Sequence, residues 1–114
     1  IVSNGGVLMG GLDVDSYGVV HESSFGFKTY QSEPLKATTV GRSLNALHIT
    51  GVETDDALRP QRNGSGFCRN ALVTGRTLPH WNPAMECSTE GVCVATGWAA
   101  AENAHEYLES LNVA

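Results

Sequence analysis

The chain has 114 residues, which is enough for one domain with a single modest core. Apolar residues make up 41% of the sequence and charged residues 17%, a balance typical of globular proteins and not of disordered ones. The formal net charge of −5 argues against nucleic acid or an anionic membrane surface as a binding partner. No apolar run approaches the roughly 20 residues of a membrane-spanning helix, so we expect no direct membrane insertion.

The cysteines indicate where in the cell the protein is located, and the first residues indicate whether the sequence is part of a longer protein. Three cysteines, an odd number, occur in a sequence without a secretory signal, which predicts reduced thiols and a cytoplasmic location. The sequence begins with Ile1-Val2 in what resembles the end of a strand, and not with methionine. We therefore expect residues 1–114 to be a single domain cut from a longer protein.

Short strands and turns are predicted for the first half of the chain. Residues 1–12 combine a short apolar segment with two glycine pairs, where the backbone can turn sharply. Residues 18–30 alternate loosely and are rich in β-forming residues, which predicts one or two strands. Residues 31–41 contain Pro34 and predict a loop, and residues 42–49 have the length of two helical turns.

The middle of the chain continues this pattern. Residues 50–60 predict a strand, a turn at Asp55-Asp56 and a second short strand that ends at Pro60. Residues 61–66 predict a flexible turn, and residues 70–74 (NALVT) predict a short buried strand because an apolar run is bounded by turn residues.

A long helix is predicted for residues 90–111. Apolar side chains recur there at spacings of three and four, and glutamates occupy the other side. The apolar set, which we expect to be buried, is Val94, Trp98, Ala101, Ala104, Leu108 and Leu111. Ser88 or Thr89 is suited to cap the helix, and Glu90 in the first turn complements the helix dipole.

Metal and catalytic motifs are weak in this sequence. Cys68, Cys87 and Cys93 lack the paired C-x2-C spacing of zinc sites, so structural thiols are favoured and no metal is expected. The glycine pairs lack the order of a dinucleotide or P-loop motif, and spacing identifies no catalytic residue. Of the four histidines, His80 alone is a candidate for ligand or substrate contact, because it lies in the turn before the long helix.

Taken in order, four segments resemble the C-terminal part of the B subunit of anaerobic glycerol-3-phosphate dehydrogenases, within the flavoproteins of the fumarate reductase and succinate dehydrogenase superfamily. The family pattern reads G-V-x-T-D-x-x-L-R-P, then N-L-x-A-x-G, then L-G-G-x-D-P, then G-G-G-V-C. The matching residues here are Gly51, Val52, Thr54, Asp55, Leu58, Arg59, Pro60, Asn70, Gly75, Leu78, Pro83, Gly91, Val92 and Cys93. Pro79-His80-Trp81-Asn82 and Cys87-Ser88-Thr89-Glu90 depart from the family's small residues, and the G-x-G-x-x-G strand–turn–helix is not within these residues.

This resemblance implies a fold and a cofactor. The fold class would be α/β or α+β, the excised C-terminal part of a flavin-binding, Rossmann-like protein with several short strands and one long C-terminal helix. A flavin, FMN or FAD, would contact the residues that match the family's glycine-rich turns and helix start. These are Gly5, Gly6, Gly75, Arg76, Thr77, Glu90, Gly91, Val92 and Cys93.

The resemblance also implies an activity, oxidation of glycerol 3-phosphate to dihydroxyacetone phosphate with electrons passed to membrane quinones. The partners would be other subunits, including a membrane-anchored iron–sulfur subunit, and the location cytoplasmic and peripheral to the inner membrane. Two alternatives remain open: a flavin-free scaffold or subunit-docking module, and a related flavoprotein of fumarate reductase type. The fragment alone is expected to bind flavin weakly or not at all.

Overall fold

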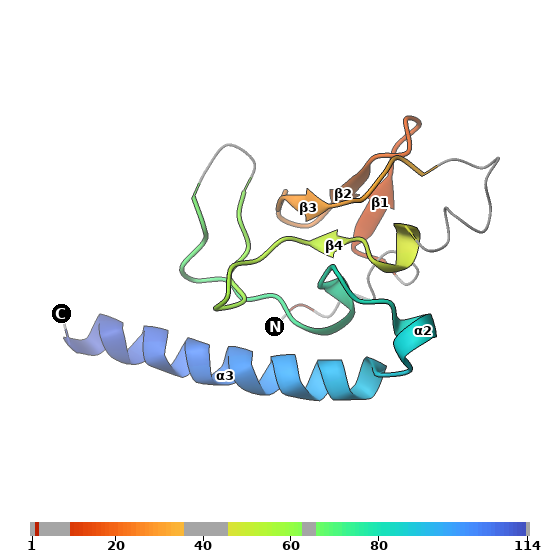
Figure 1. The fold of residues 1–114 in the computed structure, drawn as a ribbon. Helices are drawn as coiled ribbons and strands as arrows, with labels where there is room; N and C mark the ends of the chain where they lie inside the picture. The colour runs from red at the N-terminus through yellow and green to blue at the C-terminus, as the bar shows by residue number, and fades with distance from the viewer. Residues whose placement is uncertain (1, 3–9, 36–45, 63–65, 114) are drawn as a thin grey trace.

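A computed structural model describes residues 2, 10–35, 46–62 and 66–113 of the chain (Figure 1). The described elements form a small mixed α/β fold with two short antiparallel sheets and one long helix at the C-terminal end. The mixed fold class, the short strands and the long C-terminal helix predicted from the sequence are therefore confirmed. The molecule is elongated, 55 × 32 × 20 Å, because the helix extends along one side of the body.

Strands β1 (Leu12–Val14) and β2 (Val20–Glu22) form a hairpin, in which Leu12 pairs with Glu22 and Val14 with Val20. Its turn is set by Asp15, whose Oδ1 accepts hydrogen bonds from the N–H groups of Tyr17 and Val19 at 2.8 and 3.0 Å. Gly18 in this turn has φ +79°, and an added Cβ would collide with the backbone of Leu35. Only glycine therefore fits the turn as it is folded.

The second sheet pairs β3 (Thr29–Tyr30) with β4 (Gly51–Val52). β2 and β3 confirm the strands predicted in residues 18–30, and β4 confirms the strand predicted after residue 50. The second strand predicted before Pro60 is reduced to a single bridge between Thr54 and Pro60. Residues 46–48 are helical, as predicted for residues 42–49, whereas Gly5, Gly6 and residues 36–45 lie outside the described residues.

The core is small and joins the two sheets. Leu12, Val20 and Val52 are buried together, and Phe27, Leu35 and Val73 pack against them. The buried strand predicted for residues 70–74 is wrong. Asn70 is exposed, residues 71–74 are half-buried, and none of them is part of a sheet; the N–H of Val73 donates a hydrogen bond to the carbonyl of Leu58 at 2.9 Å. The segment packs on the core through one face without finding a strand partner.

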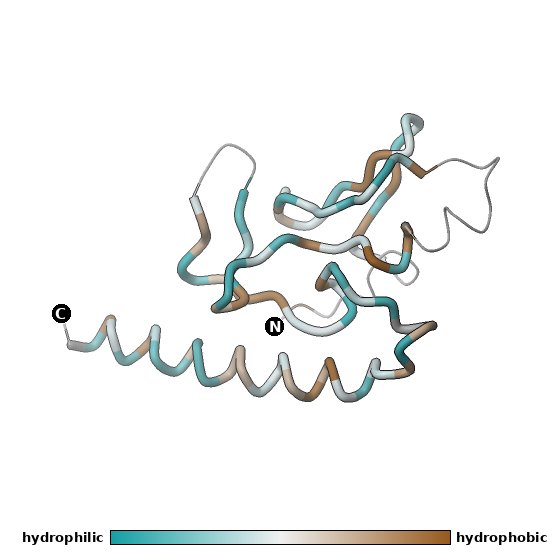
Figure 2. The backbone as a smooth tube through the Cα atoms, in the orientation of Figure 1, coloured by the Kyte–Doolittle hydropathy of each residue, from teal (hydrophilic) through white to brown (hydrophobic). Residues whose placement is uncertain are grey.

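Helix α3 spans Thr89–Val113 and confirms the helix predicted over residues 90–111. It is preceded by the 3-10 turn η1 (Gly75–Thr77) and by the four-residue helix α2 (Pro83–Glu86), which the sequence did not predict. Asn82 caps α2 through its Oδ1, which accepts a hydrogen bond from the N–H of Met85 at 3.2 Å. Figure 2 shows that α3 is more hydrophobic in its first turns than in its middle.

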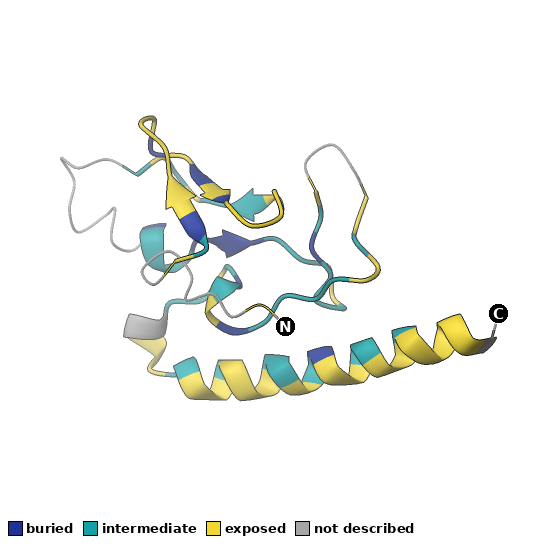
Figure 3. Cartoon of the chain, turned by 180° about the vertical axis from the view of Figure 1, so that it is seen from behind, coloured by how far each residue is buried: buried dark blue, intermediate teal, exposed yellow. Residues whose placement is uncertain are grey.

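The side of α3 that packs on the body differs from the predicted one. Ala100 is buried and Thr96 and Asn103 are half-buried, whereas Val94 and Trp98 of the predicted buried face are both 71% exposed. Figure 3 shows the exposed residues along the outward side of the helix. Small and polar residues, Thr96, Ala100 and Asn103, therefore face the body. No helix among the described residues is long and apolar enough to cross a membrane.

Candidate functional site

Turn η1 lies directly beside the first half of α3, and Gly75 makes this approach possible. Gly75 is buried with φ +72°, and a Cβ built on it would meet the Sγ atom of Cys93 at 3.2 Å. Its carbonyl accepts a hydrogen bond from the N–H of Leu78 at 3.1 Å, and the Oγ1 of Thr77 donates to the carbonyl of Thr74 at 2.9 Å. The turn is therefore closed by its own hydrogen bonds, and its positive φ together with the nearby Cys93 sulfur disfavours a side chain at Gly75.

Thr96 connects this turn to the helix. Its Oγ1 accepts a hydrogen bond from the N–H of Gly75 at 3.0 Å and donates to the carbonyl of Val92, one helical turn earlier, at 2.6 Å. One hydroxyl thus uses both its donor and its acceptor capacity, which fixes the position of η1 relative to α3. Sequence reasoning missed Thr96, because a threonine inside a helix carries no signal for a contact 21 residues away.

A groove of about 410 Å³ opens between η1, the start of α3 and the two sheets. One side is formed by the segment from Leu72 to Thr77 together with Cys93, and the opposite side comes from the hairpin and β4. The residues on that opposite side include Leu12, Glu22, Phe25, Phe27 and Val52. The groove therefore combines a backbone-rich wall with an apolar, aromatic wall.

The aromatic wall is held in place by Glu22, which is only 8% exposed. Its carboxylate accepts three hydrogen bonds, from the N–H groups of Ser24 and Phe25 at 2.8 Å each and of Phe27 at 3.1 Å. The rings of Phe25 and Phe27 stack with centroids 5.3 Å apart. Because the carboxylate accepts three backbone hydrogen bonds, it shapes the turn that presents these rings.

The structure brings four of the predicted cofactor-binding residues into this groove: Gly75, Arg76, Thr77 and Cys93. Three others, Glu90, Gly91 and Val92, belong to the first turn of α3 but do not line it. The N–H of Val92 donates to the carbonyl of Ser88 at 2.9 Å, so it is already used within the helix and is not a free donor. Unpaired N–H groups at this helix start belong to the residues before Val92.

His80 lies away from the groove. It is exposed, has φ +71°, and its N–H donates to the carbonyl of Ile49 at 3.0 Å. Its ring packs against the ring of Tyr30, with centroids 4.0 Å apart. The neighbouring Trp81 donates from Nε1 to the carbonyl of Leu78 at 3.0 Å. His80 thus packs on β3 through Tyr30, and the Trp81 indole forms a hydrogen bond within its own segment.

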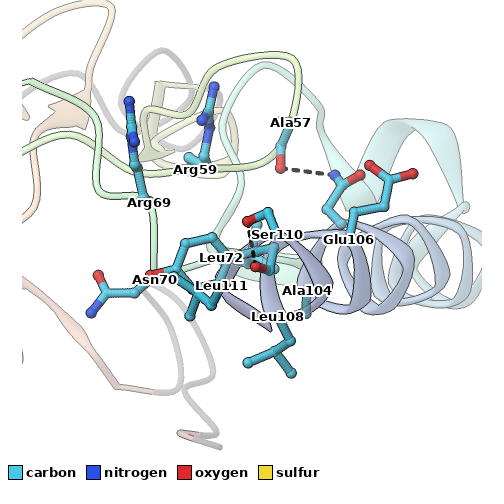
Figure 4. A pocket seen from close by; sticks show the side chains of 12 residues that line it. Ala57, Arg59, Arg69, Asn70, Leu72, Ala104, Glu106, Leu108, Ser110 and Leu111 are labelled. Carbon is cyan, nitrogen blue, oxygen red and sulfur yellow. Dashed lines mark hydrogen bonds between the residues drawn. The ribbon is translucent and has the colours of Figure 1, made fainter. Parts of the chain in front are cut away.

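A second, larger groove of about 840 Å³ lies between the C-terminal half of α3 and residues 57–59 and 69–72 (Figure 4). The Nδ2 of Asn103 donates to the carbonyl of Ala57 at 2.9 Å and holds the helix to residues 57–59. Leu72, Ala104, Leu108 and Leu111 supply apolar lining, and Arg59 and Arg69 extend from the segment opposite α3.

Asp55 organises the turn next to this second groove. Its side chain is 17% exposed and accepts hydrogen bonds from the N–H groups of Ala57 and Arg59, and its Oδ2 lies 2.7 Å from the Arg59 guanidinium. Partial burial raises the pKa of Asp55, but the N–H and guanidinium of Arg59 and the N–H of Ala57 together lower it below its ordinary value. Arg59 is thus occupied by Asp55. The described residues contain no cluster of three or more histidine, cysteine or acidic side chains placed to hold a metal ion.

The fold and the first groove define a mixed α/β chain in which a glycine turn and a long C-terminal helix form one wall of a ligand-sized crevice. Sequence comparison identifies related proteins. The B subunit of anaerobic glycerol-3-phosphate dehydrogenase from Vibrio vulnificus is 38% identical over 63 residues, 55% of this chain and 14% of that protein. A protein of Halobacterium salinarum, described as the probable B subunit of the same dehydrogenase, is 33% identical over 111 residues, 95% of this chain and 26% of that protein.

The chain is therefore a relative of the B subunit of anaerobic glycerol-3-phosphate dehydrogenase, and the resemblance predicted from its sequence is confirmed. It spans about a quarter or less of the length of these curated relatives. No protein-family model and no solved structure matches it.

Proposed function

We propose that this chain is the C-terminal portion of a flavin-dependent subunit of an anaerobic, quinone-linked glycerol-3-phosphate dehydrogenase. In this role it supplies one wall of the flavin crevice, and the remaining wall lies in sequence outside these residues. The complete enzyme would oxidise glycerol 3-phosphate to dihydroxyacetone phosphate and pass the electrons to the membrane quinone pool. The related proteins are named as subunits of this dehydrogenase, which supports an oxidoreductase complex.

One observation carries the proposal: residues selected from the family resemblance, and far apart in the sequence, line the same groove. Gly75, Arg76 and Thr77 come from η1, and Cys93 comes from the first turns of α3. The groove volume of about 410 Å³ lies within the ~300–1,000 Å³ range of small-molecule sites. The Phe25 and Phe27 rings supply an aromatic, apolar part of the lining suited to contact with an isoalloxazine ring.

The side chains of this wall suit a flavin in different ways. Gly75 has no Cβ, which lets a ligand approach the backbone closely. Arg76 is exposed at the groove and carries a permanent positive charge for a phosphate or for the anionic reduced ring. Thr96 fixes η1 and so keeps both groups in place. A bound flavin supplies the hydride chemistry, and these residues bind and orient it.

Partners and location follow from the same proposal. The related proteins are named as subunits, and we propose that this one docks on other subunits, including a membrane-anchored iron–sulfur subunit. It would then lie at the cytoplasmic side of the inner membrane and be held there through its partners.

The test uses the accessibility of Cys93 in the full-length protein that contains this chain. Cys93 lines the groove, whereas Cys87 is exposed outside it, so the two thiols form a matched pair. We expect added FMN or FAD to slow alkylation of Cys93 at least about tenfold and to leave Cys87 unchanged. Equal alkylation rates of Cys93 with and without saturating flavin would argue against a flavin in this groove. For the 114-residue chain alone we expect weak protection or none.

A second candidate function, a subunit-docking module without flavin, is favoured by one observation. The outward side of α3 exposes large apolar side chains, which is unusual for a face that is not an interface. A full-length protein that assembles with its partner subunits but contains no flavin would support this alternative.

A further inference from the structure

The outward side of α3 carries a regular line of largely exposed residues, the last of which, Leu108, also borders the second groove. Val94, Trp98, Ala101, His105 and Leu108 follow one another at spacings of four, three, four and three. This is the 3.5-residue repeat with which one helix packs along another. We call these five residues the α3 seam. Val94 and Trp98 are 71% exposed and Leu108 is 57% exposed.

The seam lies away from the hydrogen bonds that hold α3 to the body. Thr96 and Asn103 bond to Gly75 and Ala57 across the inner side of the helix, and Ala100 is buried there. In Figure 3 the outer side is exposed over the whole length of α3. The described body therefore leaves most of the seam exposed while these inner contacts exist, and a partner that packs on it has to come from outside the described residues.

The charges beside the seam indicate which kind of partner would bind there. Helix α3 contains four glutamates and no lysine or arginine. Glu102 and Glu109 directly follow two seam residues and border the seam. The Oε1 of Glu102 accepts a hydrogen bond from Trp98 Nε1 at 3.0 Å, and Glu109 lies 3.2 Å from His105 Nε2. Acidic borders repel anionic lipid and a second copy of the same helix, and they attract lysine or arginine.

We propose that the α3 seam docks an amphipathic helix of another polypeptide, with an apolar line flanked by lysine or arginine. The 14 residue steps from Val94 to Leu108 correspond to about 21 Å of helix at 1.5 Å per residue. This length gives about two heptads of contact, with Trp98 as its largest apolar group. The inference stands on the helix alone and does not require a flavin in the groove.

The experiment uses two synthetic helical peptides as probes, with the same leucine line but flanked by lysine in one and by glutamate in the other. Within the 114 residues of this chain, Trp81→Phe leaves Trp98 as the single tryptophan, so its emission in this chain reports burial of the seam. We expect a blue shift with the lysine-flanked peptide, binding at least about tenfold tighter than with the glutamate-flanked peptide, and weakening in salt. Equal binding of both peptides, or none, would overturn the proposal.

Two variants separate docking on the seam from general attraction of a basic peptide to an acidic protein. Leu108→Glu adds a negative charge within the seam, and Tyr17→Glu adds the same charge in the β1–β2 turn, where Tyr17 is 83% exposed. Seam docking predicts that Leu108→Glu weakens binding of the lysine-flanked peptide about tenfold or more and that Tyr17→Glu does not. Tighter binding of both variants would overturn the proposal in favour of unspecific charge attraction.

Two further measurements test whether the seam instead binds a second copy of the chain or a membrane surface. A blue shift of Trp98 that grows with protein concentration, together with dimer formation in sedimentation, would overturn the proposal in favour of a second copy. A blue shift with vesicles of one-third anionic lipid would overturn it in favour of a membrane surface. We expect neither, because the glutamates of α3 oppose both.

Discussion

The hydrogen bond between Gly75 and Thr96 offers the sharpest stability test of the contact between η1 and α3. Thr96→Val keeps the shape of the side chain but removes the acceptor for the Gly75 N–H, which lies 3.0 Å from Oγ1. Gly75 is buried, so its N–H loses its partner without gaining water. Leaving a buried donor unsatisfied costs about 1–3 kcal/mol, so we expect a loss of about 2 kcal/mol in the free energy of unfolding.

The assay is urea unfolding followed by tryptophan fluorescence, with Ser110→Ala as the matched control. The Oγ of Ser110 donates to the carbonyl of Tyr107 at 2.6 Å, much as Thr96 bonds Val92, but Ser110 is exposed and this bond stays within its own helix. We expect Ser110→Ala to stay within about 0.5 kcal/mol of the parent chain. Hydrogen exchange at the Gly75 amide should accelerate in Thr96→Val. Equal stabilities of Thr96→Val and Ser110→Ala would refute the assignment of Thr96 as the link between η1 and α3.

Three further predictions concern the groove wall, the turn η1 and the Asp55 turn. Glu22→Ala leaves three backbone N–H groups without their acceptor and should lower the free energy of unfolding, measured in urea, by about 2–4 kcal/mol. The control Glu53→Ala loses only an exposed ion pair with Lys28 at 3.5 Å and should lower it by less than about 1 kcal/mol. Gly75 and Gly26 have similar positive φ values, 72° and 70°, but only a Cβ at position 75 would meet another atom, Cys93 Sγ at 3.2 Å. Gly75→Ala should therefore be more destabilising than Gly26→Ala in the same assay. Equal losses of stability would contradict this contact. The folded-state pKa of Asp55 is lowered, so ionised Asp55 stabilises the fold above pH 3.8, its ordinary pKa, and this stabilisation is lost as pH falls through the folded-state pKa. Asp55→Asn should therefore flatten the fall in the free energy of unfolding below about pH 5. An unchanged pH profile of stability would count against this role of Asp55.

The sequence predicted those parts of the fold that depend on local patterns. The α3 boundaries followed from a periodic segment preceded by capping residues, and the β4 strand and Asp55 turn followed from turn residues between apolar pairs. The side of α3 that packs was predicted wrongly. A 3.5-residue apolar repeat identifies an interface but not the partner, and here Thr96, Ala100 and Asn103 make the contacts with the body.

The candidate groove was predicted on one side only. Gly75, Arg76, Thr77 and Cys93 came from the order of family motifs, but the opposite wall, with Phe25 and Phe27, did not. This wall depends on pairing of β1 with β2 and on the bonds to Glu22, contacts that no local pattern specifies. Residues 70–74 were predicted as a strand because their composition is apolar, but a strand needs a neighbour for its backbone bonds, and here Val73 bonds to Leu58 outside any sheet.

The most direct test of the central claim is the absorbance spectrum of the full-length protein that contains this chain, after gentle purification under anaerobic conditions. We predict flavin bands near their usual positions in the parent protein and a marked loss of bound flavin in Arg76→Ala, with Arg69→Ala outside the flavin groove as the control. A folded, colourless and flavin-free parent protein would contradict the account.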